Sequence, residues 1–577
     1  MSFSSDTRAK NIEEMQSEVF DLLIIGGGIT GAGVARDAAS RGMKVALIEA
    51  DDFGSGTSSR SSKLIHGGIR YLENLEFGLV FEALRERRNL FEIAPHLVHP
   101  LRFQLPLYKG GRVGMFKLGL GMWLYDALSL FEVPMLHERL SKKEALERAP
   151  MLREEGLLGA YVYSDAYMDD DRMVIETLRS ANHNGAVAAN YVKATGGIVE
   201  EGRLSSVKVK DLVGEKEFAI RARHFVSTVG PWTDLVGSAV LGEWKKLLRP
   251  SKGIHITLRR DRLPLDEAVV MISDDEKRIV FGIPRHEMII IGTTDTDFPE
   301  DPSEVTSTRD DIEYLLHIAN SYFPNADITE DDIIASYSGV RPLVDDGADE
   351  ESKTSREHLI FSDPRNITFV TGGKYTTYRS MAEETVEVAL EHFPLEDRVR
   401  FSKPNTLEPL NPLVSPEKLH RAQIEAHKTA RLKGLSECLV RKLVDRHGKE
   451  AEVILDRYLP NQLNGGLRLS QSSEEALMWE LEAKHAIRET MCLKLIDFYL
   501  RRAPLFLSRQ DHGLMLADHL SRVFKNELGW SDAQRTREVS LIREHLETEM
   551  GWRSPKEYIV AEKNRPGASE GDRRPTT

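Results

Sequence analysis

The feature that most constrains the fold is a glycine-rich turn between an apolar run and a helix of small residues. Residues 21–35 read DLLIIGGGITGAGVA, in which Gly26, Gly28 and Gly31 have the spacing G-x-G-x-x-G. The first glycine permits a tight turn, the second lets a pyrophosphate approach the backbone, and the third lets the helix pack closely against the strand. The helix N-terminus then faces the phosphates. The segment therefore predicts a Rossmann-type βαβ unit that binds a dinucleotide.

The residues after this turn favour FAD over NAD. A second apolar strand, residues 44–48, ends at Glu49, whose carboxylate can accept hydrogen bonds from ribose hydroxyls and disfavours the ribose phosphate of NADP. The loop at residues 56–73 is rich in Ser, Thr and Gly, so its hydroxyls and amides can bind the phosphates and ring of a flavin. The alternative, a flexible surface loop, is disfavoured by three apolar residues within it: Leu64, Ile65 and Ile69.

Length and composition indicate a soluble protein of two or three domains. The chain has 577 residues, whereas a single core stops growing at ~250–300 residues. Its net charge of -14 argues against general affinity for nucleic acid. The two cysteines, Cys438 and Cys492, form no CxxC pair and no secretory leader is apparent, so we expect a reducing, cytoplasmic environment without disulfides or a metal site. The absence of any run of ~18 apolar residues argues against an ordinary transmembrane helix.

The pattern along the chain predicts an α/β body followed by an all-α domain. Short β-branched runs alternate with helical stretches until about Leu390, and after the proline-rich passage 404–416 long charged amphipathic stretches follow. We expect an FAD-binding domain, a substrate domain with a mixed sheet, a helical C-terminal domain and two flexible tails. The FAD-binding domain comprises residues 18–100, 155–235 and 335–400, and the substrate domain comprises residues 101–154 and 236–334. The helical domain comprises residues 405–555, and the tails are residues 1–17 and 562–577.

Several separated motifs resemble those of the FAD-dependent, quinone-linked glycerol-3-phosphate dehydrogenases. They include TSSRSSKLIHGGIRYLE, YSDAYMDDDRMV, IGTTDTDF, YSGVRPL and TGGKYTTYR. The resemblance covers nearly the whole chain and thins beyond about Pro404. It implies a glutathione-reductase-like FAD-binding domain with an amino-acid-oxidase-type substrate domain. It also implies a reaction, the oxidation of sn-glycerol 3-phosphate to dihydroxyacetone phosphate, with electrons passed from FAD to a membrane quinone.

The resemblance also implies residues that bind the substrate phosphate. A dianionic phosphate requires several cations with directional donors. By motif position, these residues are Arg70, Tyr71, Arg356 and Lys374. Arg356 lies in the least distinctive stretch of the four.

For the chemical step, the resemblance implicates His255 in SKGIHITL and Arg341 in YSGVRPL. A histidine of ordinary pKa ~6.5 can accept a proton at neutral pH, and an arginine can stabilise the forming alkoxide and ketone oxygen. The alternative for His255 is a strand histidine satisfied by a backbone partner. Which group takes the proton stays open at this stage.

Further contacts to FAD are implied at several motif positions. The Gly372-Gly373 pair lacks β-carbons, so its backbone can approach the flavin ring and present amides to it. The acidic stretch 161–171 is interpreted mainly as a structural loop. The remaining positions implied to contact FAD are Ser58, Ser62, His66, the backbone at Val192, Gly230, and the segment from Gly373 through Lys374 to Thr376.

Two further sequence features bear on the electron acceptor and the location of the protein. No calcium-loop pattern occurs, so a bacterial-type enzyme on the cytoplasmic side of the inner membrane fits better than the calcium-regulated mitochondrial form. The apolar segment 114–131 suits either a buried or an interfacial helix, and the basic residues Lys109, Arg112 and Lys117 beside it suit an anionic bilayer. These features favour a quinone as the electron acceptor. The alternative is oxygen, which a glycerol-3-phosphate oxidase uses to form hydrogen peroxide.

Two other classes of function stay open. In one, FAD is structural and the chain is a scaffold or redox sensor whose helical domain binds a partner. In the other, the same fold oxidises an amine or amino acid, which requires a carboxylate-binding site in place of a phosphate-binding one. A homodimer is possible, and the helical domain shows no chemistry of its own.

Overall fold

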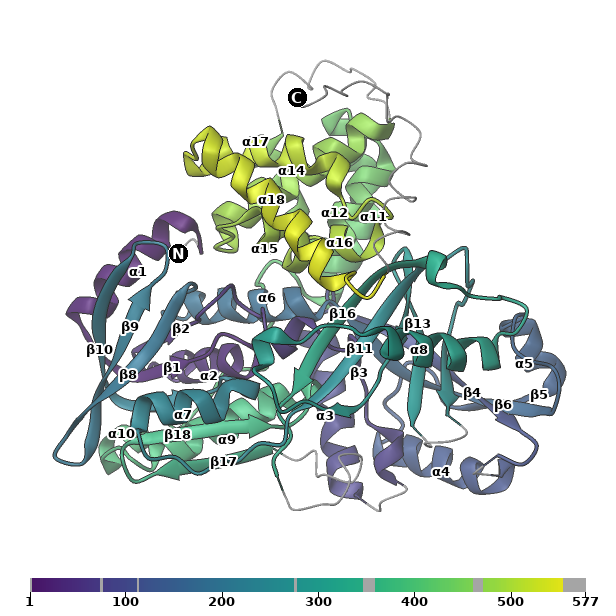
Figure 1. Ribbon diagram of the computed structural model, residues 1–577, viewed down its shortest axis with the longest axis horizontal. Coiled ribbons are helices and arrows are strands. Elements are labelled where there is room, and N and C mark those ends of the chain that lie inside the picture. The colour runs from purple at the N-terminus through teal and green to yellow at the C-terminus, as the bar shows by residue number, and fades with distance from the viewer. Residues whose placement is uncertain are drawn as a thin grey trace, which may run out of the picture.

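The computed structural model describes residues 3–72, 76–111, 114–273, 278–345, 358–459 and 471–553. In these residues eight strands form a first sheet in the order β17-β18-β10-β1-β2-β7, with β9 beside β10 and β8 beside β9 (Figure 1). Strand β1 (Val19–Ile25) pairs in parallel with β2 (Val45–Ile48) and with β10 (Lys216–Ser227). The other strands are β7 (Val187–Ala189), β8 (Val192–Glu200), β9 (Arg203–Asp211), β17 (His358–Asp363) and β18 (Ile367–Gly372).

Helices pack closely against this sheet because helix α2 is made of small residues. Helix α2 (Ile29–Ser40) connects β1 to β2 and shares a buried core with α6 (Asp170–His183) and α9 (Tyr378–Leu390). A β-carbon at Gly33 would lie 3.0 Å from the side chain of Tyr378 on α9, so the glycine allows this contact. A Rossmann-type arrangement, as expected from the glycine turn, is confirmed.

The second sheet contains ten strands in the described residues, in the order β15-β11-β14-β13-β12-β4-β6-β3, with β16 beside β11 and β5 beside β6. Most pairs are antiparallel, whereas β12 and β4 run parallel, which makes the sheet mixed as expected. The strands are β3 (Leu64–Ile65), β4 (Val98–Tyr108), β5 (Glu138–Ser141), β6 (Leu157–Met168), β11 (Ser251–Arg259), β12 (Ala268–Ile272), β13 (Ile279–Arg285), β14 (Met288–Gly292), β15 (Thr296–Asp297) and β16 (Ile333–Arg341).

Side-chain alternation on β11 positions the candidate base. Ile254, Ile256 and Leu258 pack in one core with helix α8 (Arg309–Tyr322). Because successive side chains of a strand point to opposite faces, His255 lies on the face away from α8. The remaining helices of the body are α3 (Phe77–Ile93), α4 (Met115–Leu128), α5 (Lys142–Arg148), α7 (Thr233–Leu241) and α10 (Leu395–Arg400).

Two strands near the expected domain boundaries, β6 and β16, lie in the second sheet and not in the first. Residues 155–235 and 335–400 were assigned to the FAD-binding domain, but β6 pairs with β4 and β16 pairs with β11, so both strands belong to the second sheet. Such pairings join segments far apart in the chain, and local periodicity does not report them. The chain therefore crosses between the two sheets as many times as the sequence-based division expects, but at different residues.

The prediction of a flexible tail at residues 1–17 is wrong for the part described. Residues Ser5–Ser17 form helix α1, which begins with a capping box at Ser4. Arg8 is buried, donates to the carbonyl oxygen of Asn190 and forms an ion pair of 2.6 Å with Asp211. Polar contacts of this kind leave no hydrophobic periodicity, which is why the sequence pattern missed the helix. The other expected tail, 562–577, lies outside the described residues.

The C-terminal domain is all-α in the residues described, as expected, and lies across both sheets (Figure 1). It has its own hydrophobic core. No helix in the described part of the chain is long and apolar enough to cross a membrane. The helices of this domain are α11 (Pro416–Lys433), α12 (Glu437–His447), α13 (Glu450–Tyr458), α14 (Gln471–Glu489), α15 (Leu495–Arg501), α16 (Leu505–Ser508), α17 (Leu514–Leu528) and α18 (Asp532–Glu549).

Candidate active site

The glycine turn has the shape of a dinucleotide cradle. Gly26 has φ +108°, and a β-carbon there would lie 2.8 Å from the carbonyl oxygen of Thr228. A β-carbon on Gly31 would lie 1.9 Å from the carbonyl oxygen of Gly26, so the helix can approach the strand only without one. Gly28 is the N-cap of α2, and a β-carbon there would lie 3.1 Å from the Ser58 hydroxyl. These residues fit a pyrophosphate at the helix N-terminus.

Glu49 is held beside the same turn. Its Oε2 accepts a hydrogen bond from the amide of Gly27 at 2.7 Å, and its Oε1 accepts one from the amide of Asp51 at 2.9 Å. Burial raises the pKa of Glu49 to about 7. Each carboxylate oxygen has a second lone pair for a ribose hydroxyl. Val192 lies next to it, with its amide donating to the carbonyl oxygen of Glu49 at 2.7 Å.

The loop at residues 57–66 connects this turn to the second sheet. The hydroxyl of Ser58 accepts a hydrogen bond of 2.9 Å from the amide of Ile29, the first residue of α2. Four residues later, Ser62 Oγ lies 2.8 Å from Nε2 of His255 on β11. The loop is therefore not a free surface loop, and it brings implied FAD contacts to the implied base.

His255 is enclosed by its cross-strand neighbours. It lies opposite Gly292 and Tyr337, and a β-carbon at Gly292 would lie 2.2 Å from Cδ2 of the histidine ring. The ring stacks on Tyr337 with centroids 4.8 Å apart. Burial, followed by the positive charges of Arg341 and Lys63, keeps the pKa of His255 well below its usual 6.5. The imidazole is therefore neutral at neutral pH and can accept a proton.

Arg341 lies at the end of β16 and is held by the turn that follows β14. A β-carbon at Gly253 would lie 2.3 Å from its guanidinium, so this glycine makes room for the group. The guanidinium donates hydrogen bonds to Thr293 Oγ1 at 2.9 Å, the carbonyl oxygen of Thr294 at 3.1 Å and Asp295 Oδ1 at 3.0 Å. The IGTTD motif thus orients Arg341.

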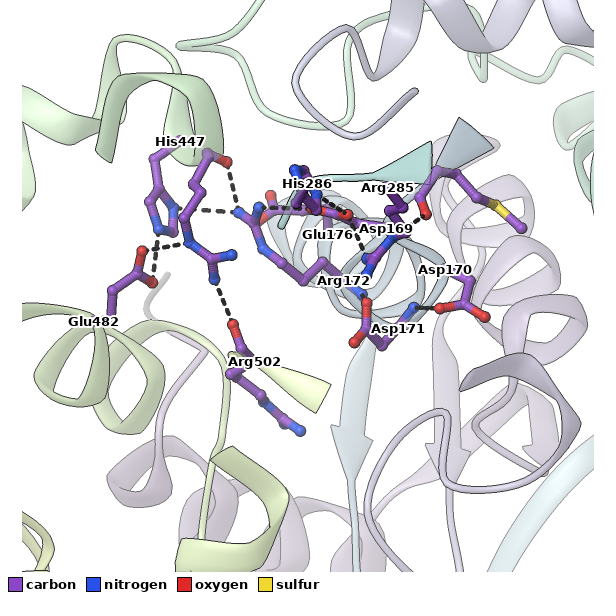
Figure 2. Close-up of polar contacts among 12 residues, drawn as sticks. Asp169, Asp170, Asp171, Arg172, Glu176, Arg285, His286, His447, Glu482 and Arg502 are labelled. Atoms are coloured by element: carbon purple, nitrogen blue, oxygen red, sulfur yellow. Dashed lines mark hydrogen bonds and ion pairs between the residues drawn. The ribbon is translucent and has the colours of Figure 1, made fainter. Parts of the chain in front are cut away.

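Lys63 and Asp170 form a buried ion pair beneath this site, and sequence reasoning assigned neither a role. Lys63 Nζ donates to Asp170 Oδ1 at 2.5 Å and to the carbonyl oxygen of Ser59 at 3.1 Å, while Ser61 Oγ donates to Asp170 Oδ2. The stretch 161–171, interpreted as a loop, is strand β6 and the start of α6, where Figure 2 draws Asp170 and Asp171. The signal was present, since both residues lie in motifs of the resemblance, but only the fold brings the motifs together.

A third segment, residues 372–376, meets the same loop. Gly372 and Gly373 have φ of +72° and +82°, a conformation that favours glycine. The hydroxyl of Thr376 accepts a hydrogen bond of 3.2 Å from the amide of His66. Lys374 lies half-buried between these positions. The implied FAD contacts on both segments therefore lie close together.

The remaining predicted residues lie on two short 3-10 helices or outside the described residues. Arg70 and Tyr71 are in a 3-10 helix, η2 (Ile69–Leu72), but their side chains lie outside the description. Arg356 lies outside the described residues altogether. Gly230, with φ +55°, opens the 3-10 helix η3 directly after β10. Their roles stay predictions.

One group of metal-ligating side chains occurs among the described residues, away from this site. His447, Glu450 and His485 are buried, with ligand atoms all within 4.8 Å of one another. Glu450 is already paired with Arg179 at 2.6 Å, and His447 with Glu482 at 2.9 Å. The expectation that the protein binds no metal stays a prediction.

Comparison with known proteins gives matches over nearly the whole chain. A family described as FAD dependent oxidoreductase matches residues 21–385, and one described as the C-terminal domain of alpha-glycerophosphate oxidase matches residues 413–535. The aerobic glycerol-3-phosphate dehydrogenase of Staphylococcus aureus is 33% identical over 538 residues, which cover 92% of this chain and 95% of the relative. That of Staphylococcus saprophyticus is 31% identical over 560 residues, covering 95% and 98%.

Solved structures with this fold include two with FAD bound. The glycerol-3-phosphate dehydrogenase from Bacillus halodurans complexed with FAD matches with a TM-score of 0.75 and 29% identity, covering 96% of this chain and 99% of that chain. The L-alpha-glycerophosphate oxidase from Mycoplasma pneumoniae with FAD bound matches with a TM-score of 0.53 and 16% identity, covering 64% and 95%. At that identity the second likeness concerns the fold alone.

Proposed function

We propose the reaction of this protein from one premise: the chain belongs to the family of FAD-dependent glycerol-3-phosphate dehydrogenases. Its substrate is then sn-glycerol 3-phosphate, and its product is dihydroxyacetone phosphate. The observation that carries this proposal is the contact of 2.8 Å between Ser62 and His255, which joins the FAD-binding loop to the candidate base on the other sheet.

In this proposal each side chain has a separate task. Bound FAD supplies the two-electron acceptor for the oxidation of the alcohol. His255 takes the hydroxyl proton at Nε2, where the substrate hydroxyl replaces the Ser62 hydroxyl as the hydrogen-bond partner. Arg341, oriented by the turn after β14, stabilises negative charge on the substrate oxygen as the proton leaves. Lys63 and Asp170 hold the loop that carries Ser62 in position.

The proposal is tested by anaerobic stopped-flow absorbance of the purified yellow protein. Rapid bleaching by sn-glycerol 3-phosphate, but not by glycerol or a D-amino acid, is the expected result. Bleaching by the amino acid alone would indicate an amino-acid oxidase instead. A flavin that stays oxidised with all three compounds would support a scaffold or sensor and refute the proposed reaction.

Lys374 is proposed to bind the substrate phosphate. Lys374→Met removes a charged donor, and a hydrogen bond to a charged group contributes ~1.5–3 kcal/mol. We therefore expect the substrate concentration for half-maximal flavin reduction to rise about ten- to a hundredfold, while FAD content and the limiting reduction rate change little. The measurement is a stopped-flow substrate titration. Lys193→Met, which changes a lysine exposed on β8, serves as the control; an unchanged titration for Lys374→Met would remove Lys374 from the phosphate site.

We further propose that electrons pass to a membrane quinone and that helix α4 contacts the bilayer. Met122, Tyr125 and Asp126 anchor α4 to the body, whereas Phe116 is 82% exposed and Leu120 and Trp123 are more than half exposed. Several large apolar side chains exposed on one helix indicate an interaction surface. The exposed lysines Lys109 and Lys117 beside it favour an anionic bilayer as the occupant. The location is then peripheral, on the cytoplasmic face of the membrane.

The double variant Phe116→Ser, Trp123→Ser tests this surface. We expect it to lose binding to phosphatidylglycerol vesicles by about tenfold or more, because each aromatic side chain contributes ~1.5–3 kcal/mol on burial. Its anaerobic reduction by substrate should not change. Met515→Ser, at an apolar residue that is 83% exposed on α17, is the matched control. Unchanged vesicle binding by the double variant would exclude α4 as the membrane-binding surface. The electron acceptor is tested separately: faster reoxidation of the wild-type flavin by oxygen than by quinone would identify an oxidase.

A further inference from the structure

The loop that carries Glu49 is packed tightly against the glycine turn. The amide of Gly54 donates to the carbonyl oxygen of Gly27 at 3.0 Å. A β-carbon at Gly27 would lie 2.8 Å from both Cβ of Glu49 and Cδ1 of Phe53. A small displacement of this loop would therefore move Glu49 relative to the turn.

Between Glu49 and Gly54, the loop is held by the C-terminal helical domain. Asp52 is fully buried, and its carboxylate accepts hydrogen bonds from Arg501 Nε at 2.6 Å and from both terminal nitrogens of Arg502. Asn190, at the end of β7, donates to the same carboxylate at 3.0 Å. A carboxylate at this depth requires such partners, because an unpaired buried charge is strongly unfavourable.

A second link from the helical domain reaches the neighbouring residue. The hydroxyl of Tyr191 donates to Asp497 on α15 at 2.8 Å, and its backbone amide donates to the carbonyl oxygen of Asp51 at 2.9 Å. Arg501 completes the link, since it also donates to Asp497 at 2.7 Å. Two consecutive residues of the nucleotide loop are thus tied to α15.

The arginines are themselves fixed from the opposite side. The guanidinium of Arg446 on α12 donates to Glu482 at 2.6 Å and to the carbonyl oxygen of Arg502 at 2.5 Å (Figure 2). Arg172 on α6 donates in turn to the carbonyl oxygen of Arg446 at 2.6 Å. Arg502 therefore reaches Asp52 from a chain segment that hydrogen bonds connect to α12 and, through it, to α6 and α14.

We propose that Arg501 and Arg502 are positioning residues for FAD, through which the C-terminal helical domain holds the ribose-binding loop in place. The domain thereby becomes part of the cofactor site, although none of its side chains is assigned to FAD itself. This inference rests on FAD binding at the glycine turn and Glu49, and it does not depend on the identity of the substrate.

The test is FAD affinity, measured by titrating apoprotein with FAD and following flavin fluorescence. Arg502→Gln should raise the FAD dissociation constant about tenfold, as expected for the loss of a coupled buried contact, and Arg502→Lys should restore part of the affinity. The control is Arg179→Gln, on α6, which breaks a different ion pair to the helical domain, with Glu450 at 2.6 Å, without touching the nucleotide loop. Arg179→Gln should lower the thermal midpoint and leave FAD affinity unchanged.

Either of two results would overturn the proposal: unchanged FAD affinity in Arg502→Gln, or an equal loss in Arg179→Gln, which would mean that any loosening of the helical domain weakens FAD. If Arg502→Gln does not fold, Asp52→Asn and Arg501→Gln, alone and combined, replace it. Their effects on FAD affinity should not add, because both changes break the same ion pair, between Asp52 and Arg501. At saturating FAD the variants should recover reduction of the flavin by the substrate. A wild-type protein that binds FAD but does not react with glycerol 3-phosphate would refute the proposed function and leave this inference intact.

Discussion

Replacing His255 with alanine is expected to slow anaerobic reduction of the flavin by glycerol 3-phosphate by about 10²–10⁴-fold, the usual contribution of a general base. The ring is buried against Tyr337 and lies 2.8 Å from the Ser62 hydroxyl, where a neutral imidazole can take a proton. Substrate affinity should change little, since phosphate binding depends on other residues. Single-turnover stopped-flow absorbance separates the two effects, and an unchanged limiting rate would remove His255 from the mechanism.

A pH profile separates a chemical role from a structural one. Because burial and two nearby cations keep the pKa of His255 well below 6.5, the neutral form that acts as base persists as pH falls through that value. The wild-type reduction rate should therefore stay level from about pH 8 to 6.5 and decline only in more acidic solution. His224→Ala is the matched control, since His224 is also a buried strand histidine whose pKa is lowered to about 4. This variant should lose stability without losing the reduction rate.

The parts of the fold that could be predicted are those specified within short stretches of chain. The glycine turn, the second strand and Glu49 lie within one βαβ unit, and each has a local residue pattern, so the Rossmann arrangement and a dinucleotide followed from them. The adjacent Ser/Thr/Gly-rich loop at residues 56–73, also a local pattern, favoured FAD. The helical domain was predictable for the same reason, because amphipathic periodicity is a local property.

The parts that could not be predicted depend on contacts between distant segments. Strand β6 joins the second sheet through its pairing with β4, and helix α1 is anchored by Arg8 to Asn190 and Asp211. The same holds for the candidate site, where Lys63 meets Asp170 from a separate motif. Polar pairs between distant residues have no periodic signature, whereas burial makes each of them energetically important.

Gly28→Val is expected to give a folded but colourless protein. Gly28 has φ -76° and ψ -174°, a conformation that valine adopts readily. Among the described atoms beyond its chain neighbours, only the Ser58 hydroxyl lies within 4 Å of its β-carbon position. The apoprotein should therefore fold. The added methyl groups would instead occupy the N-terminus of α2, where the pyrophosphate must approach. Overpacking of this kind costs ~1–3 kcal/mol or more, so FAD affinity should fall by about fivefold to a hundredfold or more.

The neighbouring glycine distinguishes loss of the cofactor from loss of the fold. A β-carbon on Gly31 would lie 1.9 Å from the carbonyl oxygen of Gly26 and 2.6 Å from the hydroxyl of Thr228, so Gly31→Val should impair folding itself. Gly78→Val, at an exposed helical glycine with no atom within 4 Å of its β-carbon position, should affect neither property. Flavin absorbance per protein and the thermal midpoint of the apoprotein are measured for all three variants. If Gly28→Val retains FAD at the wild-type ratio, the pyrophosphate does not bind at this turn, whatever the family resemblance implies.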